Sequence, residues 1–256
     1  MSDGSPAGRP AALARDGAGV RIAVIDSGVA SGHPHVGEVS EGIWMRDDDT
    51  SPEFADRIGH GTAVAGAIHD LAPAATLIAV RIFERRLSTT SVILARAIRW
   101  AAGEGGASLI NLSLGTTNLR QTEMLLAAVA DAHAAGAIVV GAERDGDLPC
   151  LPGSLGGTPG GEGVLAVRVD PDAARDRVTI LAEPARPVLA ASPYPKSIPG
   201  VSTERNLSGV SFAVANVTGL MARLLARESG VMGAADLVER LRRDQESSGA
   251  DTAAKR

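Results

Sequence analysis

The sequence predicts a three-layer α/β/α protein built on a mostly parallel sheet. Short aliphatic runs alternate with segments of helical periodicity along the 256-residue chain, a pattern typical of right-handed βαβ units. Hydrophobic residues make up 45% of the sequence but aromatic residues only 2%, so the core must consist mainly of aliphatic side chains. Aliphatic runs suit parallel strands, because these are buried on both faces. We therefore expect one domain with a sizeable core.

The first half of the chain contains two expected strands and two expected helices. An aliphatic strand at 20–28 ends in an acidic residue, a serine and a glycine, and a polar loop follows at 47–59. A helix is expected to begin near His60, because apolar residues recur there every three or four positions. A second strand lies at 76–83, and the hydroxyl groups of Ser88–Thr90 are suitable caps for the helix that follows.

The second half continues the same alternation until a loop interrupts it. A third strand is expected at 108–115, a helix around Thr122–His133, and a fourth strand at 137–142. The segment 143–163 is rich in glycine and proline, which predicts a loop. Two further strands and two further helices are expected at 164–170, at 178–183, after Ser211 and at Ala234–Arg243.

Composition and the chain ends limit the possible locations and partners. Residues 1–17 are expected to form a flexible arm, residues 18–245 a single domain, and residues 246–256 a disordered tail. The N-terminal segment lacks the apolar centre of a signal peptide, and no apolar run approaches the ~20 residues of a membrane span. A net charge of −5 gives no electrostatic reason to expect binding to nucleic acid or to an anionic membrane. With Cys150 as the single cysteine, no intrachain disulfide can form, which favours a cytoplasmic location.

Three short stretches carry side chains that together suit nucleophilic catalysis. Asp26 lies in VIDSG, His60 in GHGTAVAG and Ser211 in SGVSFAVA. Acyl transfer by a serine needs a base to take the hydroxyl proton and a carboxylate to orient that base. Taken singly, Asp26 is a turn residue at a strand end, and His60 and Ser211 are ordinary residues at helix starts. Taken together, their order on a parallel α/β scaffold is one that catalytic triads adopt.

Four sequence blocks in this order resemble the subtilisin-like serine proteases, or subtilases, over most of residues 18–228. Asp26-Ser27-Gly28 matches the aspartate block, His60 through Gly66 match the histidine block, and INLSLG at 110–115 matches the block that lines the substrate cleft. The resemblance implies a subtilisin-like fold. The serine block is matched at Gly209, Ser211, Ala213, Val217 and Gly219.

The resemblance also implies a serine endopeptidase that acts on a peptide or protein substrate and needs no cofactor. Ser211 would be the nucleophile that forms an acyl-enzyme, His60 the general base, and Asp26 the residue that orients His60. The loop at 153–163 would form part of the primary specificity pocket. The residues that would pair with an extended substrate backbone are Ser113, Leu114 and Gly115.

The chain departs from the family pattern at the oxyanion hole. Subtilases place an asparagine amide there, but Glu143 and Arg144 stand where the family has glycine and asparagine, and Val210 replaces a threonine donor. In a subtilisin, losing one such donor costs about 10²–10³ in turnover. Two alternatives stay open. Either Arg144 or a neighbouring amide serves the oxyanion, or Glu143 and Arg144 form a solvated surface pair.

Further departures concern metal binding and processing. The family's calcium-binding insertion is missing from the helix after His60, and the acidic run Asp47–Asp49 is interpreted as a solvated loop, so no tightly bound metal is expected. Residues 1–19 are too few for the family's large propeptide, which suggests a compact intracellular enzyme that matures a dedicated peptide. Cys150 has no matched base and is interpreted as a structural thiol.

Two functional hypotheses follow from the matches and the departures. The first is an endopeptidase with Asp26, His60 and Ser211 as its triad. The alternative is a catalytically impaired subtilase-like domain that binds a peptide or protein partner without cutting it. The intact triad favours the enzyme, and the altered oxyanion block favours the binding domain. Nothing in the sequence specifies an oligomeric state or a cleavage sequence.

Overall fold

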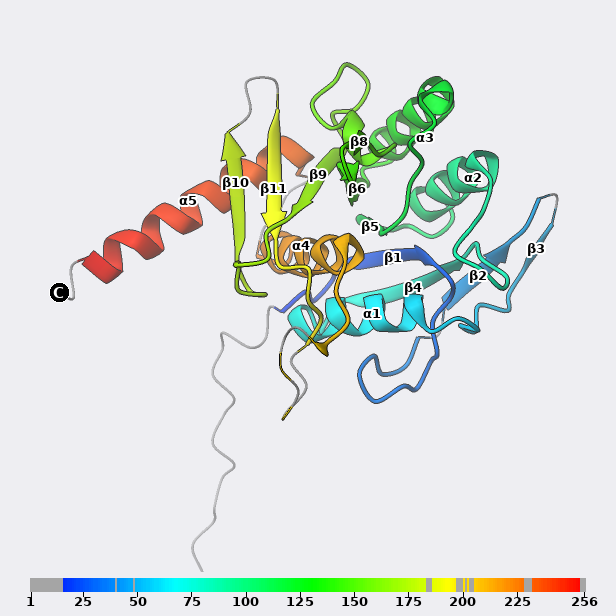
Figure 1. Ribbon diagram of the computed structural model, residues 1–256, viewed down its shortest axis with the longest axis horizontal. Coiled ribbons are helices and arrows are strands. Elements are labelled where there is room, and N and C mark those ends of the chain that lie inside the picture. Colours follow the sequence, from blue (N-terminus) through cyan, green and yellow to red (C-terminus); the bar gives the residue numbers. More distant parts are fainter. Residues whose placement is uncertain are drawn as a thin grey trace, which may run out of the picture.

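A mostly parallel sheet forms the middle layer of the protein (Figure 1). The structure is a computed structural model, and it describes residues 16–39, 41–47, 49–182, 186–196, 200, 202, 205–227 and 232–253. Within this part of the chain, nine strands pair in the order β10-β11-β9-β6-β5-β1-β4-β2-β3. Neighbouring strands are parallel except for β10–β11 and β2–β3. The strands are β1 (Arg21–Asp26), β2 (Glu41–Met45), β3 (Thr50–Ser51), β4 (Thr76–Arg81), β5 (Leu109–Leu112), β6 (Ile138–Ala142), β9 (Val164–Val169), β10 (Val178–Ala182) and β11 (Pro187–Ala191).

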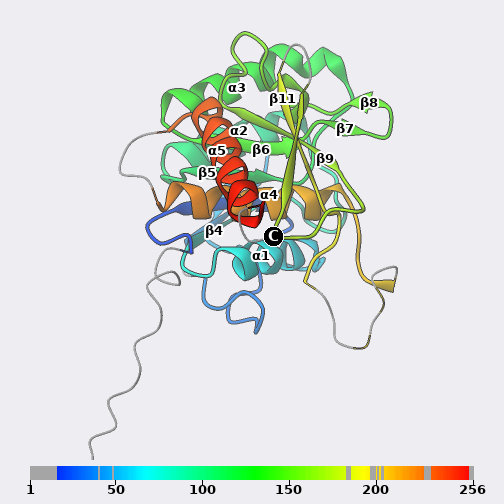
Figure 2. The ribbon, with the colours of Figure 1, turned by 90° about the vertical axis from the view of Figure 1, so that its left-hand side faces the viewer.

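Helices cover both faces of this sheet (Figures 1 and 2). Side chains of α2 and α3 share one core cluster with the sheet, and those of α1, α4 and α5 share the other. This arrangement confirms the three-layer α/β/α fold that the sequence predicts. The helices are α1 (His60–Leu71), α2 (Ser91–Ala102), α3 (Thr122–Ala134), α4 (Val210–Leu225) and α5 (Ala234–Ala253).

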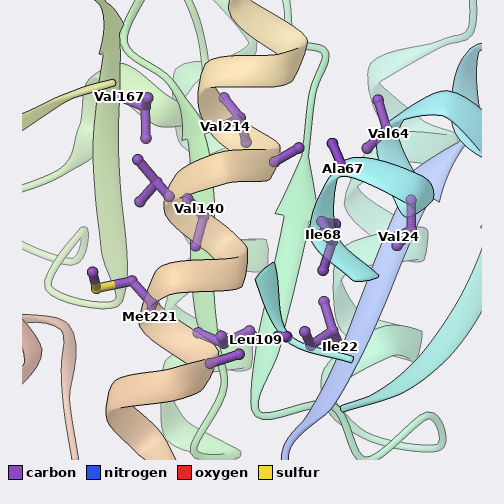
Figure 3. Close-up of a cluster of buried hydrophobic side chains, with 14 of the residues drawn as sticks. Ile22, Val24, Val64, Ala67, Ile68, Leu109, Val140, Val167, Val214 and Met221 are labelled. Carbon is purple, nitrogen blue, oxygen red and sulfur yellow. The ribbon is translucent and has the colours of Figure 1, made fainter. Parts of the chain in front are cut away.

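Alternating residues of the central strand serve the two halves of the core. In β1, Ile22 and Val24 belong to the cluster under α1 and α4, whereas Ala23 and Ile25 belong to the cluster under α2 and α3. Successive side chains of a strand point to opposite faces, so a strand covered on both sides must be aliphatic throughout. Figure 3 shows the first of these clusters, with Ile22 and Val24 facing Ile68 of α1.

Several elements differ from the sequence-based expectations. Strand β11 was not expected, because five residues that begin with a proline carry little periodicity. The loop expected at 47–59 contains β3, and the loop at 143–163 contains a small hairpin of β7 (Arg144–Asp145) and β8 (Leu148–Pro149). Strand β2 was missed as well, because its glutamate and glycine interrupt the apolar pattern.

The structure describes residues on both sides of each expected domain boundary. Asp16, from the expected N-terminal arm, accepts a hydrogen bond from the backbone of Ala74 and forms an ion pair with Arg223. At the other end, α5 continues from the expected end at Arg243 to Ala253, and Figure 1 shows it projecting from the body of the domain. The last turns of α5 are polar, so the apolar spacing that predicts the helix stops before the helix itself ends. Residues 1–15 and 254–256 lie outside the described residues.

Across the described residues, no helix combines the length and the apolar character that crossing a membrane requires.

Candidate active site

Three segments that are far apart in the sequence meet beyond the carboxyl end of β1. Asp26 is the last residue of β1, His60 the first of α1, and Ser211 the second of α4. His60 Nδ1 lies 2.8 Å and 3.0 Å from the two carboxylate oxygens of Asp26, and His60 Nε2 lies 3.2 Å from Ser211 Oγ. The structure therefore brings the predicted acid, base and hydroxyl into one hydrogen-bonded chain.

Close packing of backbones explains the glycines that follow Asp26 and His60 in their motifs. A Cβ atom on Gly61 would lie 2.2 Å from the carbonyl oxygen of Gly28. A Cβ atom on Gly28 would lie 2.3 Å from the carbonyl oxygen of Phe54, and Gly28 also has a φ of 101°, which favours glycine. A larger residue at position 61 would push the start of α1 away from the segment after β1, and one at position 28 would displace the backbone at Phe54.

The pKa of His60 is raised above its ordinary value because the ring is hydrogen-bonded to Asp26. Partial burial of the ring opposes this shift, and the negative charges of Asp26 and Asp56 add to it. The Asp26 side chain is 0% exposed and the His60 side chain is 25% exposed, so the acid is shielded while the base faces the solvent. The neutral imidazole, which can accept a proton, therefore predominates only at a higher pH than it does for an ordinary histidine.

A buried polar chain fixes the start of α4 against β5. The Ser211 hydroxyl lies 3.2 Å from the carbonyl oxygen of Ser113, and the Ser113 hydroxyl donates to the carbonyl oxygen of Ser211 at 3.4 Å. Behind them, Asn111 donates to the Ser113 hydroxyl, and Thr218 donates to the Asn111 side chain. The sequence analysis did not single out Asn111 or Thr218. Their contacts fix the position of Ser113, which in turn is hydrogen-bonded to Ser211.

The segment after β5 forms one wall of a small side-chain pocket. Within the described part of the chain, the N–H groups of Leu114 and Gly115 make no hydrogen bond, while Thr116 pairs with Leu151. A Cβ atom on Gly115 would lie 2.3 Å from the carbonyl oxygen of Leu151, so glycine is required there. The adjoining pocket has a volume of about 180 Å³. It is lined by Phe83, Leu87, Ser88, Thr89, Thr90, Ser91, Leu94, Leu114, Gly115 and Thr116.

A model of the subtilase family matches residues 17–157 of this chain. The chain belongs to the subtilase family. The matched region contains Asp26 and His60 but ends before Ser211, whose place in the site depends on its sequence motif and its distances to His60 and Ser113.

This subtilase is similar to several proteases over different parts of its length. It is 37% identical over 135 residues to a thermostable alkaline protease of Halalkalibacterium halodurans, a match that covers 49% of this chain and 36% of that protein. It is 38% identical over 113 residues to thermitase of Thermoactinomyces vulgaris, which covers 40% of this chain and 39% of thermitase. The chain thus spans less than half the length of either relative.

Two further matches cover most of the chain. Subtilisin DY of Bacillus licheniformis is 28% identical over 230 residues, which cover 82% of this chain and 78% of that protein. The solved structure of sphericase aligns with a TM-score of 0.63 at 22% identity, over 87% of this chain and 81% of sphericase. The structural likeness shows that this subtilase shares the subtilisin-like fold.

Glu143, which directly follows β6, belongs to an ion cluster. Its buried carboxylate pairs with Arg168 at 2.7 Å, with Arg186 at 2.6 Å and with Arg144 at 3.0 Å. The hydrogen bond from Arg168 is the main cause that lowers the pKa of Glu143 to about 2; burial opposes the shift and Arg144 adds to it. An ionised carboxylate only accepts hydrogen bonds, so Glu143 has no proton to donate to an oxyanion.

Arg144 takes part in this cluster through one nitrogen. Its Nε donates to Glu143, and the side chain is 44% exposed. The two terminal nitrogens of Arg144 have no hydrogen-bond partner among the described residues. The sequence analysis weighed an oxyanion donor against a solvated pair with Glu143. The structure shows the pair, but with the carboxylate buried and two further arginines bound to it.

Glu143→Gln is expected to destabilise the fold by about 3 kcal/mol at pH 7. A carboxyl whose pKa falls from 4.5 to about 2 on folding gives its full stabilisation above pH 4.5 and loses it as the pH falls towards 2, at ~1.4 kcal/mol per pH unit. The thermal midpoint should fall by about 6–12 °C. Arg144→Ala is the control, since a half-exposed ion pair contributes at most ~1 kcal/mol. Equal midpoints for Glu143→Gln and the unmodified protein would contradict this role.

Cys150 and the acidic run 47–49 are two further features that the sequence analysis considered. Burial is the main cause that raises the pKa of the Cys150 thiol to about 11, so the thiol is protonated at neutral pH. In the acidic run 47–49, Asp49 is bound to Arg46, and Asp48 lies outside the described residues. Among the described side chains, no group of three or more His, Cys, Asp or Glu residues is arranged to hold a metal ion.

Asp56 is a further residue beside His60 that the sequence analysis did not single out. It was included in a polar loop, but its carboxylate accepts five hydrogen bonds next to His60. One local signal was available: an acidic residue shortly before a helix can accept the N–H groups that the first turn leaves unpaired.

Proposed function

We propose that this subtilase is a serine endopeptidase that hydrolyses peptide bonds through an acyl-enzyme on Ser211. The main support is the chain of contacts from Ser211 Oγ to His60 Nε2 at 3.2 Å and from His60 Nδ1 to Asp26 at 2.8 Å. A hydroxyl, an imidazole and a buried carboxylate linked in this order activate the serine for attack.

The reaction uses the two nitrogens of His60 in different ways. Ser211 Oγ attacks the scissile carbonyl carbon while His60 Nε2 takes the hydroxyl proton. Asp26 accepts the hydrogen bond from Nδ1–H and stabilises the imidazolium. His60 then gives its proton to the leaving amine, and the C–N bond breaks. A water molecule attacks the acyl-enzyme with His60 again as the base, which releases the acid and restores Ser211.

The negative charge on the carbonyl oxygen needs donors that differ from those of the family. The backbone N–H of Ser211, at the N-terminus of α4, is one proposed donor. Val210 has no hydroxyl to contribute, and we propose the terminal nitrogens of Arg144 as the second donor.

Arg144→Ala should lower kcat about 100-fold and leave KM nearly unchanged, because an oxyanion donor acts only in the transition state. Steady-state kinetics on one peptide substrate measures both constants. The fold should be unaffected, as expected for a half-exposed side chain. An unchanged kcat would exclude Arg144 as a donor and leave only backbone groups.

The proposed substrate is a peptide or protein segment in extended conformation. The unpaired N–H groups of Leu114 and Gly115 are available for an added strand, and the neighbouring pocket of about 180 Å³ can take one side chain. We also propose, more narrowly, a peptide-maturation role in the cytoplasm. The single buried cysteine supports this location, because such a chain does not depend on an oxidising compartment.

The changes at positions 143, 144 and 210 favour a second candidate, a domain that binds a peptide without cutting it. Incubation with an unfolded protein and with a fluorogenic peptide library separates the two candidates. Cleavage by the unmodified protein, absent in Ser211→Ala purified in the same way, supports the endopeptidase. Peptides that bind both proteins equally and stay intact would support the binding domain instead.

A further inference from the structure

We propose that Asp56 is a positioning residue for the Asp26–His60 pair, because its carboxylate fixes the backbone around both of them. This inference deepens the proposed function and rests on it. Asp56 lies four residues before His60, on the segment that leads into α1.

One carboxylate collects five hydrogen bonds at this point. Its Oδ1 accepts from the Ser27 hydroxyl at 2.9 Å, from the N–H of Ile58 at 2.9 Å and from the N–H of Gly59 at 2.8 Å. Its Oδ2 accepts from the N–H of Thr62 at 2.9 Å and from the Thr62 hydroxyl at 2.6 Å. These donors come from the end of β1, from the preceding loop and from the first turn of α1.

The hydroxyl groups of Ser27 and Thr62, which donate to Asp56, also accept hydrogen bonds from other backbone N–H groups. The Ser27 hydroxyl accepts a hydrogen bond from the N–H of Gly61 at 2.9 Å. The Thr62 hydroxyl accepts one from the N–H of Ala30 at 3.0 Å. The residues on either side of His60 and the residue that follows Asp26 are therefore linked to Asp56, directly or through one hydroxyl. The relative positions of the acid and the base depend on this carboxylate.

The start of α1 explains why an outside carboxylate is needed. The first N–H groups of a helix lack partners within the helix, and here the N-cap residue is Gly59, which has no side chain to accept them. Gly61 is equally bare, because the close approach to Gly28 leaves no room for a Cβ atom. Asp56 supplies the acceptor from outside the helix. The backbone around His60 is therefore fixed although both neighbours of His60 are glycines.

Asp56 also places a second negative charge near the imidazole. Partial burial works to raise the pKa of Asp56, but the hydrogen bonds from Thr62, Gly59 and Ile58 outweigh it and lower the pKa, so the carboxylate is ionised at neutral pH. The charged groups that act on His60 are Asp26, from β1, and Asp56. On the α4 side the ring meets the neutral Ser211 hydroxyl. The imidazolium formed during acyl transfer is therefore stabilised by two carboxylates.

The test is Asp56→Asn, examined with two readouts. In a Ser211→Ala background, NMR titration of the His60 ring should show its pKa lowered by about 0.5 unit or more. In the catalytic background, kcat should fall about 10–100-fold with KM changed less than threefold, because a displaced base slows the chemical step. Glu53→Gln is the matched control, since it removes one charge from the same segment, and among the described residues the Glu53 carboxylate is bound to Arg57 and Arg81. It should leave both readouts nearly unchanged.

A folded Asp56→Asn protein with unchanged His60 titration and unchanged kcat would overturn the proposal. If Asp56→Asn fails to fold, Thr62→Val takes its place, because it removes one of the five hydrogen bonds to Asp56, together with the one from Ala30, and keeps the charge. Thr62→Val should move both readouts in the same direction by less, and no change in either would overturn the proposal. The titration does not require protease activity. An inactive protein whose His60 pKa still responds to Asp56 would therefore refute the endopeptidase while supporting the role of Asp56.

Discussion

Ser211→Ala is expected to slow peptide hydrolysis about 10⁶-fold, the size of the loss when the nucleophile of a subtilisin is removed. The hydroxyl is the only group of the protein that forms a bond to the substrate carbon in the proposed reaction. Its removal also ends the contact with His60 Nε2 at 3.2 Å, yet it leaves the cleft in place. The turnover rate should therefore fall while peptide binding persists. Steady-state kinetics measures the turnover and fluorescence anisotropy measures the binding, both on one substrate.

Ser208→Ala is the matched control for this variant. Ser208 is exposed and precedes α4 by two residues, so its loss should leave turnover unchanged. Residual hydrolysis within 100-fold of the unmodified protein in Ser211→Ala would mean that another group performs the attack.

Asp26→Asn should reduce kcat about 10⁴-fold. Asp26 accepts from His60 Nδ1 at 2.8 Å and 3.0 Å and from the N–H of Ser27 at 2.7 Å, and its side chain is completely buried. An asparagine amide turns one of these acceptors into a donor, which favours the wrong tautomer of His60 and removes the charge that stabilises the imidazolium. Single-turnover kinetics at pH 8 measures the chemical step.

Asp47→Asn is the control for this second variant, because Asp47 is an exposed aspartate two residues after the end of β2. Its kcat should match that of the unmodified protein. A loss of less than tenfold in Asp26→Asn would show that the buried carboxylate does not orient His60.

The fold and the three aligned side chains were predictable because their signals are local. Strand β1 is a continuous aliphatic run, and the glycines beside Asp26 and His60 mark places where two backbones touch, as the Gly61–Gly28 contact shows. The Ser211 motif adds a tight start to a helix that is buried nearly all round. Each of these patterns lies within one short segment, so a single sequence displays it.

Other features were not predictable because their partners are distant in the sequence. Glu143 binds Arg168 and Arg186, which lie 25 and 43 residues away, and no spacing rule links such residues. Asp56 contacts Ser27, which lies 29 residues before it. The surroundings of both carboxylates arise only when the sheet places separate strand ends side by side.

The ion cluster of Glu143 gives the altered oxyanion block a structural reason. Arg186 connects Glu143 to the carbonyl oxygens of Ser154 and Gly156, so the cluster fixes the loop that follows the hairpin of β7 and β8. An acidic residue at position 143 thus stabilises this loop, and Glu143 itself supplies no donor to the oxyanion.

Covalent labelling with a fluorophosphonate is the most direct check that Ser211 is an activated nucleophile, because the reagent needs a serine whose proton a neighbouring base removes. Mass spectrometry should find one adduct, on Ser211, in the unmodified protein and none in folded His60→Ala. A folded, unmodified protein that stays unlabelled at high reagent concentration, or an adduct on Ser211 that forms equally fast in His60→Ala, would contradict the proposed catalytic role of the Asp26–His60–Ser211 chain.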